Sequence, residues 1–181
     1  MFYYFWTHIV YHLIKWFHPD NRKIIRILVW ITTALLLVPQ FYAFAKPEST
    51  RYCDQPLYEM LVVSIVLTFV MCGFTFLLTL MDPVPREVKI AFHVFGGVCF
   101  VTGLVHSAMV FSALECNIFA EVLYDWSLAV AVLIMICTVY FVILIPCWIL
   151  DMICSDWILN RKEKTGICYE PEKCCPCLWH V

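Results

Sequence analysis

The sequence predicts an all-α membrane protein with four transmembrane helices, and three observations lead to this prediction. Of the 181 residues, 63% are hydrophobic and only 14% are charged, whereas a soluble domain is roughly half apolar and about a quarter charged. The mean hydropathy is +0.83. Four apolar runs of 22 to 25 residues are each long enough to cross the hydrocarbon core of a bilayer. The membrane is therefore the solvent for most of the chain, and the net charge of −2 argues against a nucleic-acid partner.

The chain divides into an N-terminal segment, a membrane domain and a tail, at residues 1–19, 20–150 and 151–181. Within the membrane domain the spans are expected at residues 24–45, 57–81, 90–114 and 126–150. Pro39 lies inside the first span, where we expect it to kink or weaken the helix. Pro83 and Pro85 predict a tight, stiff connection between the second and third spans, because proline cannot extend a helix.

The N-terminal segment is apolar and rich in aromatic residues, but it is short for a span. Tryptophan and tyrosine favour the headgroup level of a bilayer. His8, His12 and Lys15 fall on one helical face, at spacings of four and three residues. We therefore predict an interfacial amphipathic helix that lies in the membrane plane, with this polar stripe facing water. Metal binding by His8 and His12 is the less favoured alternative.

The basic residues predict the orientation of the spans. Ten lie on the side that holds both termini and the loop between the second and third spans, against only Lys46 and Arg51 on the other side. The ten are Lys15, Arg22, Lys23, Arg26, Arg86, Lys89, Arg161, Lys162, Lys164 and Lys173. Because cytosolic loops carry the excess of lysine and arginine, we expect both termini in the cytosol. The length of the spans favours the thick plasma membrane over internal membranes.

Each loop on the outer side contains one cysteine, Cys53 or Cys116. Such loops mature in an oxidising compartment, and both cysteines lie within a few residues of a span. We predict a Cys53–Cys116 disulfide, with two free thiols as the alternative.

The order of these features resembles that of a known group of membrane proteins. The motif Cys53-x-x-Pro56 precedes a span that begins Leu57-Tyr58, a third span follows, and then come Glu115-Cys116-Asn117 and a fourth span entered by Tyr124 and Trp126. Over roughly residues 25 to 150 this arrangement resembles the four-span transmembrane protein 272-like group. The resemblance implies a four-span membrane fold and brings no established activity with it.

The third span is rich in small residues and carries two histidines. Gly96, Gly103 and Ser107 share one helical face, and small residues let helices approach closely in lipid. We expect the other spans to pack against this face. His93 and His106 are the ionisable side chains well inside a span, but they are about 20 Å apart along the helix and cannot form one site by themselves. A neutral imidazole bonded to a neighbouring helix is favoured over a role in ion movement.

The tail is rich in cysteine and is expected to be cytosolic, where thiols stay reduced. Juxtamembrane cysteines are typical acceptors for palmitoylation, and the candidates are Cys147, Cys154, Cys174, Cys175 and Cys177. Zinc binding by Cys168, Cys174, Cys177 and His180 is an alternative, although their spacing matches no regular zinc finger. The last residues place Trp179 two positions before the terminal Val181, which fits a ligand of a PDZ domain.

These features favour a non-enzymatic tetraspan scaffold or accessory subunit. The sequence offers no pairing of a nucleophile with a base, so we predict no catalytic residues, no metal and no cofactor. The expected partners are the lipid bilayer, a membrane protein or a second copy of the chain, and a PDZ-domain protein. The alternative is a small channel or transporter subunit that uses the histidine-bearing third span.

Overall fold

The computed structural model describes residues 1–16, 22–50, 53–81, 84–113 and 115–153 of the 181-residue chain. The chain forms two compact units, Met1–Cys137 and Thr138–Val181. In the second unit the described residues form the last part of helix α6. All packing discussed below lies within the first unit.

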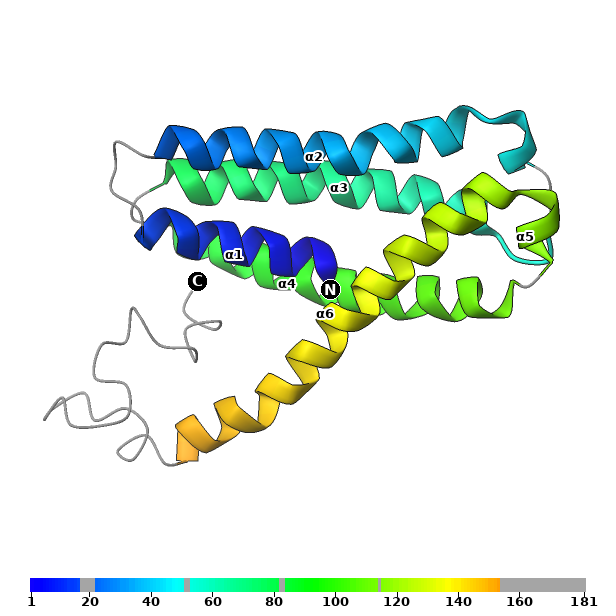
Figure 1. Ribbon diagram of the computed structural model, residues 1–181. Coiled ribbons are helices and arrows are strands. Elements are labelled where there is room, and N and C mark those ends of the chain that lie inside the picture. The colour runs from blue at the N-terminus through cyan, green and yellow to red at the C-terminus, as the bar shows by residue number, and fades with distance from the viewer. Residues whose placement is uncertain (17–21, 51–52, 82–83, 114, 154–181) are drawn as a thin grey trace, which may run out of the picture. The chain divides into compact units, whose positions relative to one another are not determined.

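The described residues are helical or lie in short loops (Figure 1). In chain order the elements are α1 (Phe2–Trp16), α2 (Arg22–Ala45), the 3₁₀ turn η2 (Pro47–Thr50), α3 (Leu57–Leu80), α4 (Arg86–Ser112), the single turn α5 (Cys116–Phe119) and α6 (Glu121–Ile153). Four stretches, within α2, α3, α4 and α6, are long and apolar enough to cross a membrane. The predicted all-α fold with four candidate spans is therefore confirmed.

Two helices begin earlier than their apolar runs. Helix α4 begins at Arg86, directly after Pro85, and not at residue 90. Helix α6 begins at Glu121 and not at residue 126. In both cases an acidic residue in the first turn suits the positive end of the helix dipole. Helix α2 continues through Pro39 and ends at Ala45, and the turn η2 ends five residues later.

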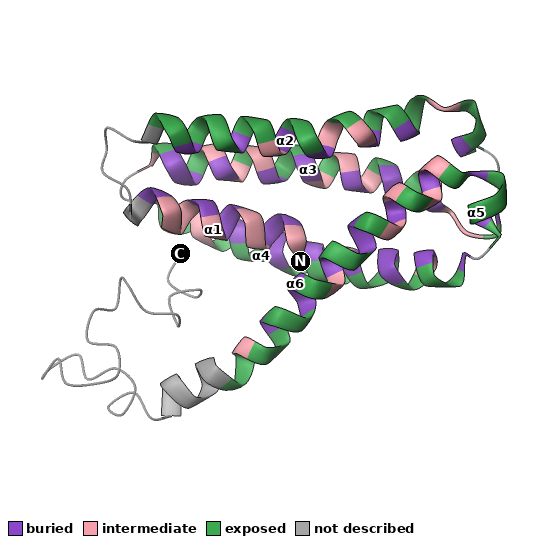
Figure 2. Cartoon of the chain, viewed as in Figure 1, coloured by how far each residue is buried: buried purple, intermediate pink, exposed green. Residues whose placement is uncertain are grey.

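Helix α1 lies inside the bundle, alongside α3 and α4 (Figure 1). Its side chains Tyr3, Thr7, His8 and Val10 are buried, and the helix is coloured mostly buried or intermediate where α2 is mostly exposed (Figure 2). At about 1.5 Å per residue, a helix of 15 residues covers only part of the length of α3. The predicted helix is present, but a position in the membrane plane is not confirmed, because its contacts are with the interior faces of the spans.

Helices α1 and α3 each pack against three other helices: α1 against α2, α3 and α4, and α3 against α1, α2 and α4. We had expected α4 to have that central position. The reason is the location of α1, which occupies the interior beside α3 and α4. Apolar clusters fill the two ends of the bundle. One includes Val10, Ile14, Ile25 and Val29; the other includes Leu57, Leu61, Val110, Ala113, Leu123 and both cysteines Cys53 and Cys116.

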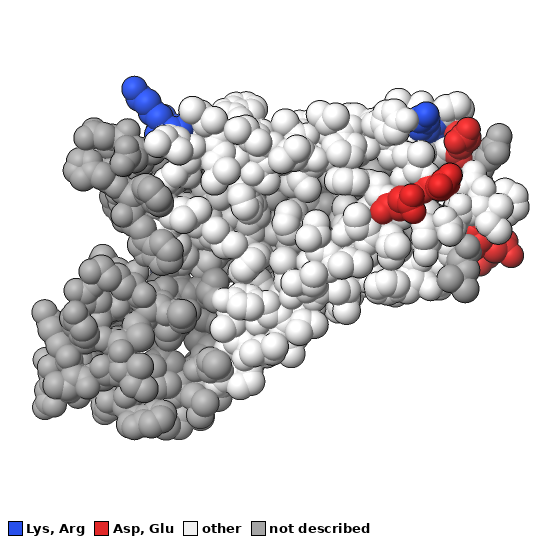
Figure 3. All heavy atoms as spheres, viewed as in Figure 1, with Lys and Arg blue, Asp and Glu red and all other residues white. Residues whose placement is uncertain are grey.

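Charged side chains of the described residues lie near the ends of these helices. On the face shown in Figure 3, lysine, arginine and acidic side chains of the described residues appear at the two ends of the spans. The described surface between them on this face is uncharged. The exposed apolar side chains of α2 include Trp30, Leu35 and Val38. A belt of this kind suits the hydrocarbon region of a bilayer.

Candidate functional site

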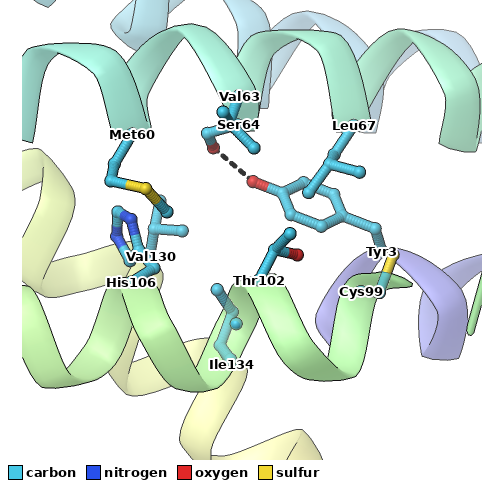
Figure 4. A pocket seen from close by; sticks show the side chains of 11 residues that line it. Tyr3, Met60, Val63, Ser64, Leu67, Cys99, Thr102, His106, Val130 and Ile134 are labelled. Carbon is cyan, nitrogen blue, oxygen red and sulfur yellow. Dashed lines mark hydrogen bonds between the residues drawn. The ribbon is translucent and has the colours of Figure 1, made fainter. Parts of the chain in front are cut away.

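The main polar feature of the interior is a network of side chains between α1, α2 and α3. Tyr3 and Thr7 are four residues apart and therefore lie on one face of α1, toward α3. The Tyr3 hydroxyl bonds the hydroxyl of Ser64 (Figure 4). One turn later, Thr7 Oγ1 is 3.1 Å from Thr75 Oγ1 and 3.4 Å from the carbonyl oxygen of Met71. These pairings show that α1 and α3 run in the same direction.

Gln40 joins α2 to the same network. Its side chain is fully buried, and Nε2 donates toward Ser64 Oγ at 3.3 Å and Thr68 Oγ1 at 3.2 Å. Bonds of this kind between helices contribute about 0.6 kcal/mol each on average in a membrane protein. We name Tyr3, Thr7, Gln40, Ser64, Thr68 and Thr75 the interior polar network.

A signal for this network was present in the sequence. Ser64, Thr68, Thr75 and Thr79 recur at spacings of four, seven and four residues, which places them on one face of α3, and all four are buried. Hydroxyl residues in an apolar helix can bond their own backbone, as Thr68 does to the carbonyl of Ser64 at 2.8 Å. A row of them therefore did not by itself identify a partner helix.

A small cavity lies beside Tyr3, where the interior is lined by α3, α4 and α6 (Figure 4). Its polar lining includes Ser64, Thr102 and His106. The volume is about 10 Å³, which is roughly the space that one water molecule requires. The cavity is therefore a water site in size and not a ligand pocket.

His106, one of the two histidines noted in the third span, is buried at this cavity. Its Nε2 is 3.2 Å from the backbone oxygen of Ser127 on α6. Because a carbonyl oxygen can only accept, Nε2 carries the proton in this contact. This contact joins the imidazole to a neighbouring helix.

The glycines of α4 differ sharply in their surroundings. A Cβ atom on Gly96 would lie 2.8 Å from Cδ2 of Tyr4, and one on Gly103 would lie 2.7 Å from Cγ2 of Ile134. Gly97 has no such neighbour within 4 Å. Ser107, the third small residue of that face, is buried as well. The close neighbour of Gly96 belongs to α1, which the sequence did not place there.

His93, the other histidine of the third span, contacts α1. Its Nδ1 is 3.2 Å from the hydroxyl of Tyr4, whose ring stacks on Phe92 at a centroid distance of 4.5 Å. Burial raises the pKa of Tyr4 to about 12, so this hydroxyl is neutral. His93 and His106 thus lie in different surroundings, as their separation along the helix indicated.

The polar stripe predicted on α1 also differs from expectation. His8 is fully buried, and its Nε2 is 2.9 Å from Nε2 of His12. A surface facing water was predicted here, and that prediction is wrong for His8. The burial of this face of α1 depends on contacts with residues that are distant in sequence, such as the contact of Tyr4 with Gly96 on α4.

Cys53 and Cys116 form the predicted disulfide. The bond connects the loop that follows α2 to the start of α5, and both cysteines are buried in the apolar cluster at that end. Nearby, Asp54 has a positive φ of 71°, which marks a tight turn directly after Cys53.

The candidate sites of the tail lie outside the described residues. This applies to Cys154, Cys174, Cys175 and Cys177 and to the C-terminal Trp179 and Val181. Cys147 lies within α6, but its side chain is not described. Within the described part of the chain, no group of three or more His, Cys, Asp or Glu side chains is placed to hold a metal ion.

The comparisons with known proteins leave the fold and the site to be interpreted on their own terms. No protein-family model matches the chain, and neither a curated protein nor a solved structure matches it significantly.

Proposed function

We propose that the protein is a non-enzymatic, multi-pass membrane scaffold or accessory subunit. The observation that supports it most is how fully the described interior is occupied. The side chains of the interior polar network are uncharged and bond one another, as Gln40, Ser64 and Thr68 do. The cavity beside His106 has a volume of only about 10 Å³. The cavity beside His106 leaves little room for a substrate. A larger hollow of about 120 Å³ lies beside the disulfide, away from the interior polar network, and is lined by Thr50, Cys53, Gln55, Pro56, Tyr58, Glu59 and Leu123.

The exposed faces supply the surface that a scaffold requires. Helix α2 packs on α3 through a narrow face and leaves the rest uncovered: Leu36 is 8% exposed, whereas Leu35 and Val38 are each 67% exposed. Lipid or the span of another protein can cover such a face. The proposed partners are therefore a membrane protein or a second copy of this chain.

The proposal includes an orientation with both termini in the cytosol, in the plasma membrane. It is supported by the ten basic residues on one side against Lys46 and Arg51 on the other. Acylation of the tail cysteines and capture of the Val181 carboxylate by a PDZ domain would add cytosolic attachments. The resemblance to the transmembrane protein 272-like group is compatible with such a role.

Photo-crosslinking tests the scaffold role with a matched pair of positions. A crosslinking amino acid is placed at Leu35 or at its neighbour Leu36 in the full chain, in native membranes. We expect a discrete protein adduct from position 35 and only intramolecular products from position 36, which faces α3. Lipid adducts alone at Leu35, Val38 and Val94, which lie on α2 and α4, would refute the proposal.

A small channel or transporter subunit is the second candidate, because His106 lines a cavity with Ser64 and Thr102. Ion or proton flux into liposomes that contain the purified protein distinguishes the two. If the protein is a scaffold, liposomes that contain it should show the same flux as liposomes without protein. Flux that is present with the wild-type chain and lost in His106→Ala would establish the channel instead.

A further inference from the structure

His8 and His12 form a close pair on α1 that plays no part in the proposed function. The two residues are four apart on α1 and therefore lie on the same face, one turn from each other. Their Nε2 atoms point at one another at a distance of 2.9 Å, and the ring centroids are 4.7 Å apart. Each Nε2 has only one hydrogen or one lone pair to offer, so their contact depends on opposite tautomers.

We propose that His8 and His12 together bind a divalent transition-metal ion through their Nε2 atoms. Imidazole nitrogen is a ligand that suits zinc, copper and nickel. Two histidines at this spacing on a helix are also the arrangement by which zinc is held in helical metal sites. With metal–nitrogen bonds of about 2.05 Å, nitrogens 2.9 Å apart subtend an angle of about 90° at the ion.

That angle determines which ions fit best. A right angle between neighbouring ligands is found in tetragonal and octahedral coordination, which Cu²⁺ and Ni²⁺ favour. Tetrahedral Zn²⁺ requires the two nitrogens to separate by a few tenths of an ångström. His12 is only half-buried, so its ring has room to adjust. Water molecules complete the coordination in either case.

The surroundings hold His8 in place before an ion arrives. The ring of His8 is fully buried and lies 6.0 Å from the ring of Tyr4, which itself contacts Gly96 and bonds His93. A ligand that is already fixed loses little conformational entropy on binding. His12 lies one turn before the end of α1 and is only half-buried, so it is the member of the pair that is nearer to solvent.

The protons are also compatible with an ion. In the metal-bound form both Nε2 atoms supply lone pairs, so each ring keeps its proton on Nδ1, and binding needs a tautomer shift without net proton release. His8 Nδ1 is buried and has no hydrogen-bond partner among the described residues. In one of the two metal-free tautomers, His8 Nδ1 already carries the proton. Binding of the ion to that tautomer therefore leaves the number of unsatisfied donors on His8 unchanged.

Thermal unfolding of the full chain in detergent, without a polyhistidine tag, tests the site. An ion that binds only the folded state raises the unfolding midpoint as its concentration increases. We expect Ni²⁺ to raise the midpoint of the wild-type protein. For His12→Gln, at least about tenfold more Ni²⁺ should be required for the same rise in the midpoint, because one of two ligands is lost. His106→Gln is the matched control: it changes another buried histidine and should respond like the wild type.

A second comparison separates this site from the cysteine-rich tail. A chain with Cys168, Cys174, Cys175 and Cys177 changed to serine and with His180→Gln should keep the full Ni²⁺ response. Electron paramagnetic resonance of bound Cu²⁺ should show coupling to two nitrogens, and to fewer in His12→Gln. The proposal is overturned if none of Ni²⁺, Cu²⁺ and Zn²⁺ shifts the midpoint, or if His12→Gln responds like the wild type.

Discussion

The contact between Gly96 and Tyr4 leads to a prediction that compares two neighbouring glycines. Replacing Gly96 with alanine adds a methyl group 2.8 Å and 2.9 Å from two ring carbons of Tyr4. Carbon atoms normally pack at about 3.5–4.0 Å, so the ring must move by up to about 1 Å. Its stacking on Phe92 and its bond to His93 restrict that movement. Gly97→Ala makes no such contact, since nothing lies within 4 Å.

The difference between the two variants isolates the packing cost. Both gain the same intrinsic helix propensity, about 1 kcal/mol for alanine over glycine. Only Gly96→Ala overpacks the interior, which typically costs about 1–3 kcal/mol. We therefore expect Gly96→Ala to unfold about 1–3 kcal/mol more easily than Gly97→Ala, measured by reversible unfolding in mixed micelles.

A double-mutant cycle identifies the cause of that difference. In a Tyr4→Ala background the ring is absent, so the added methyl group at position 96 should cost little. Equal stability of the two single variants would show that α1 does not pack against Gly96. A penalty that persists without the ring would assign the cost to some other contact.

Three further predictions concern the network, the disulfide and the buried histidine. Gln40→Leu should lower the free energy of unfolding by about 1 kcal/mol, because its interhelical bonds to Ser64 and Thr68 are lost. Thr32→Val, at an exposed position on the same helix whose hydroxyl bonds its own backbone, should change the free energy of unfolding little; equal effects would contradict the network. Cys53→Ser should abolish the mobility shift between reducing and non-reducing gels and remove up to about 4 kcal/mol, and an unchanged shift would disprove the bond. Burial, with the nearby His12 and His93 in addition, lowers the pKa of His8 to about 3, so only the unfolded chain binds this proton between that value and about 6.5. In metal-free buffer, stability should therefore fall by about 1.4 kcal/mol per pH unit as the pH drops below about 6.5, and a slope that His8→Gln leaves unaltered would refute this assignment.

The four spans and the disulfide were readable from the sequence because their signals are local. An apolar run of sufficient length has few alternatives to a span, and Cys53 and Cys116 each follow an apolar run closely, in the first and third loops between the runs. Helices α4 and α6 begin before these apolar runs. Charged residues such as Arg86 and Glu121 stand at the start of a helix, ahead of its apolar run.

The interior polar network and the position of α1 were missed because they depend on tertiary pairing. The short length and aromatic composition of α1 suit both an interfacial helix and a helix buried between spans. Only the match of Tyr3 and Thr7 with Ser64 and Thr75 distinguishes the two. Those partners are more than 60 residues away in sequence, and a single sequence gives no information about which of several hydroxyl rows is used.

The burial of α1 has a consequence for biosynthesis. Helix α1 leaves the ribosome before α3 and α4 exist, yet these two helices supply most of its contacts. It therefore packs only after they are made. A short amphipathic helix can lie at the surface of the bilayer until the later spans have been inserted. Closure of the bundle by α1 is then a late, post-insertion event. A chain interrupted after α2 would leave α1 at the membrane surface, where quality-control factors can recognise it as unassembled.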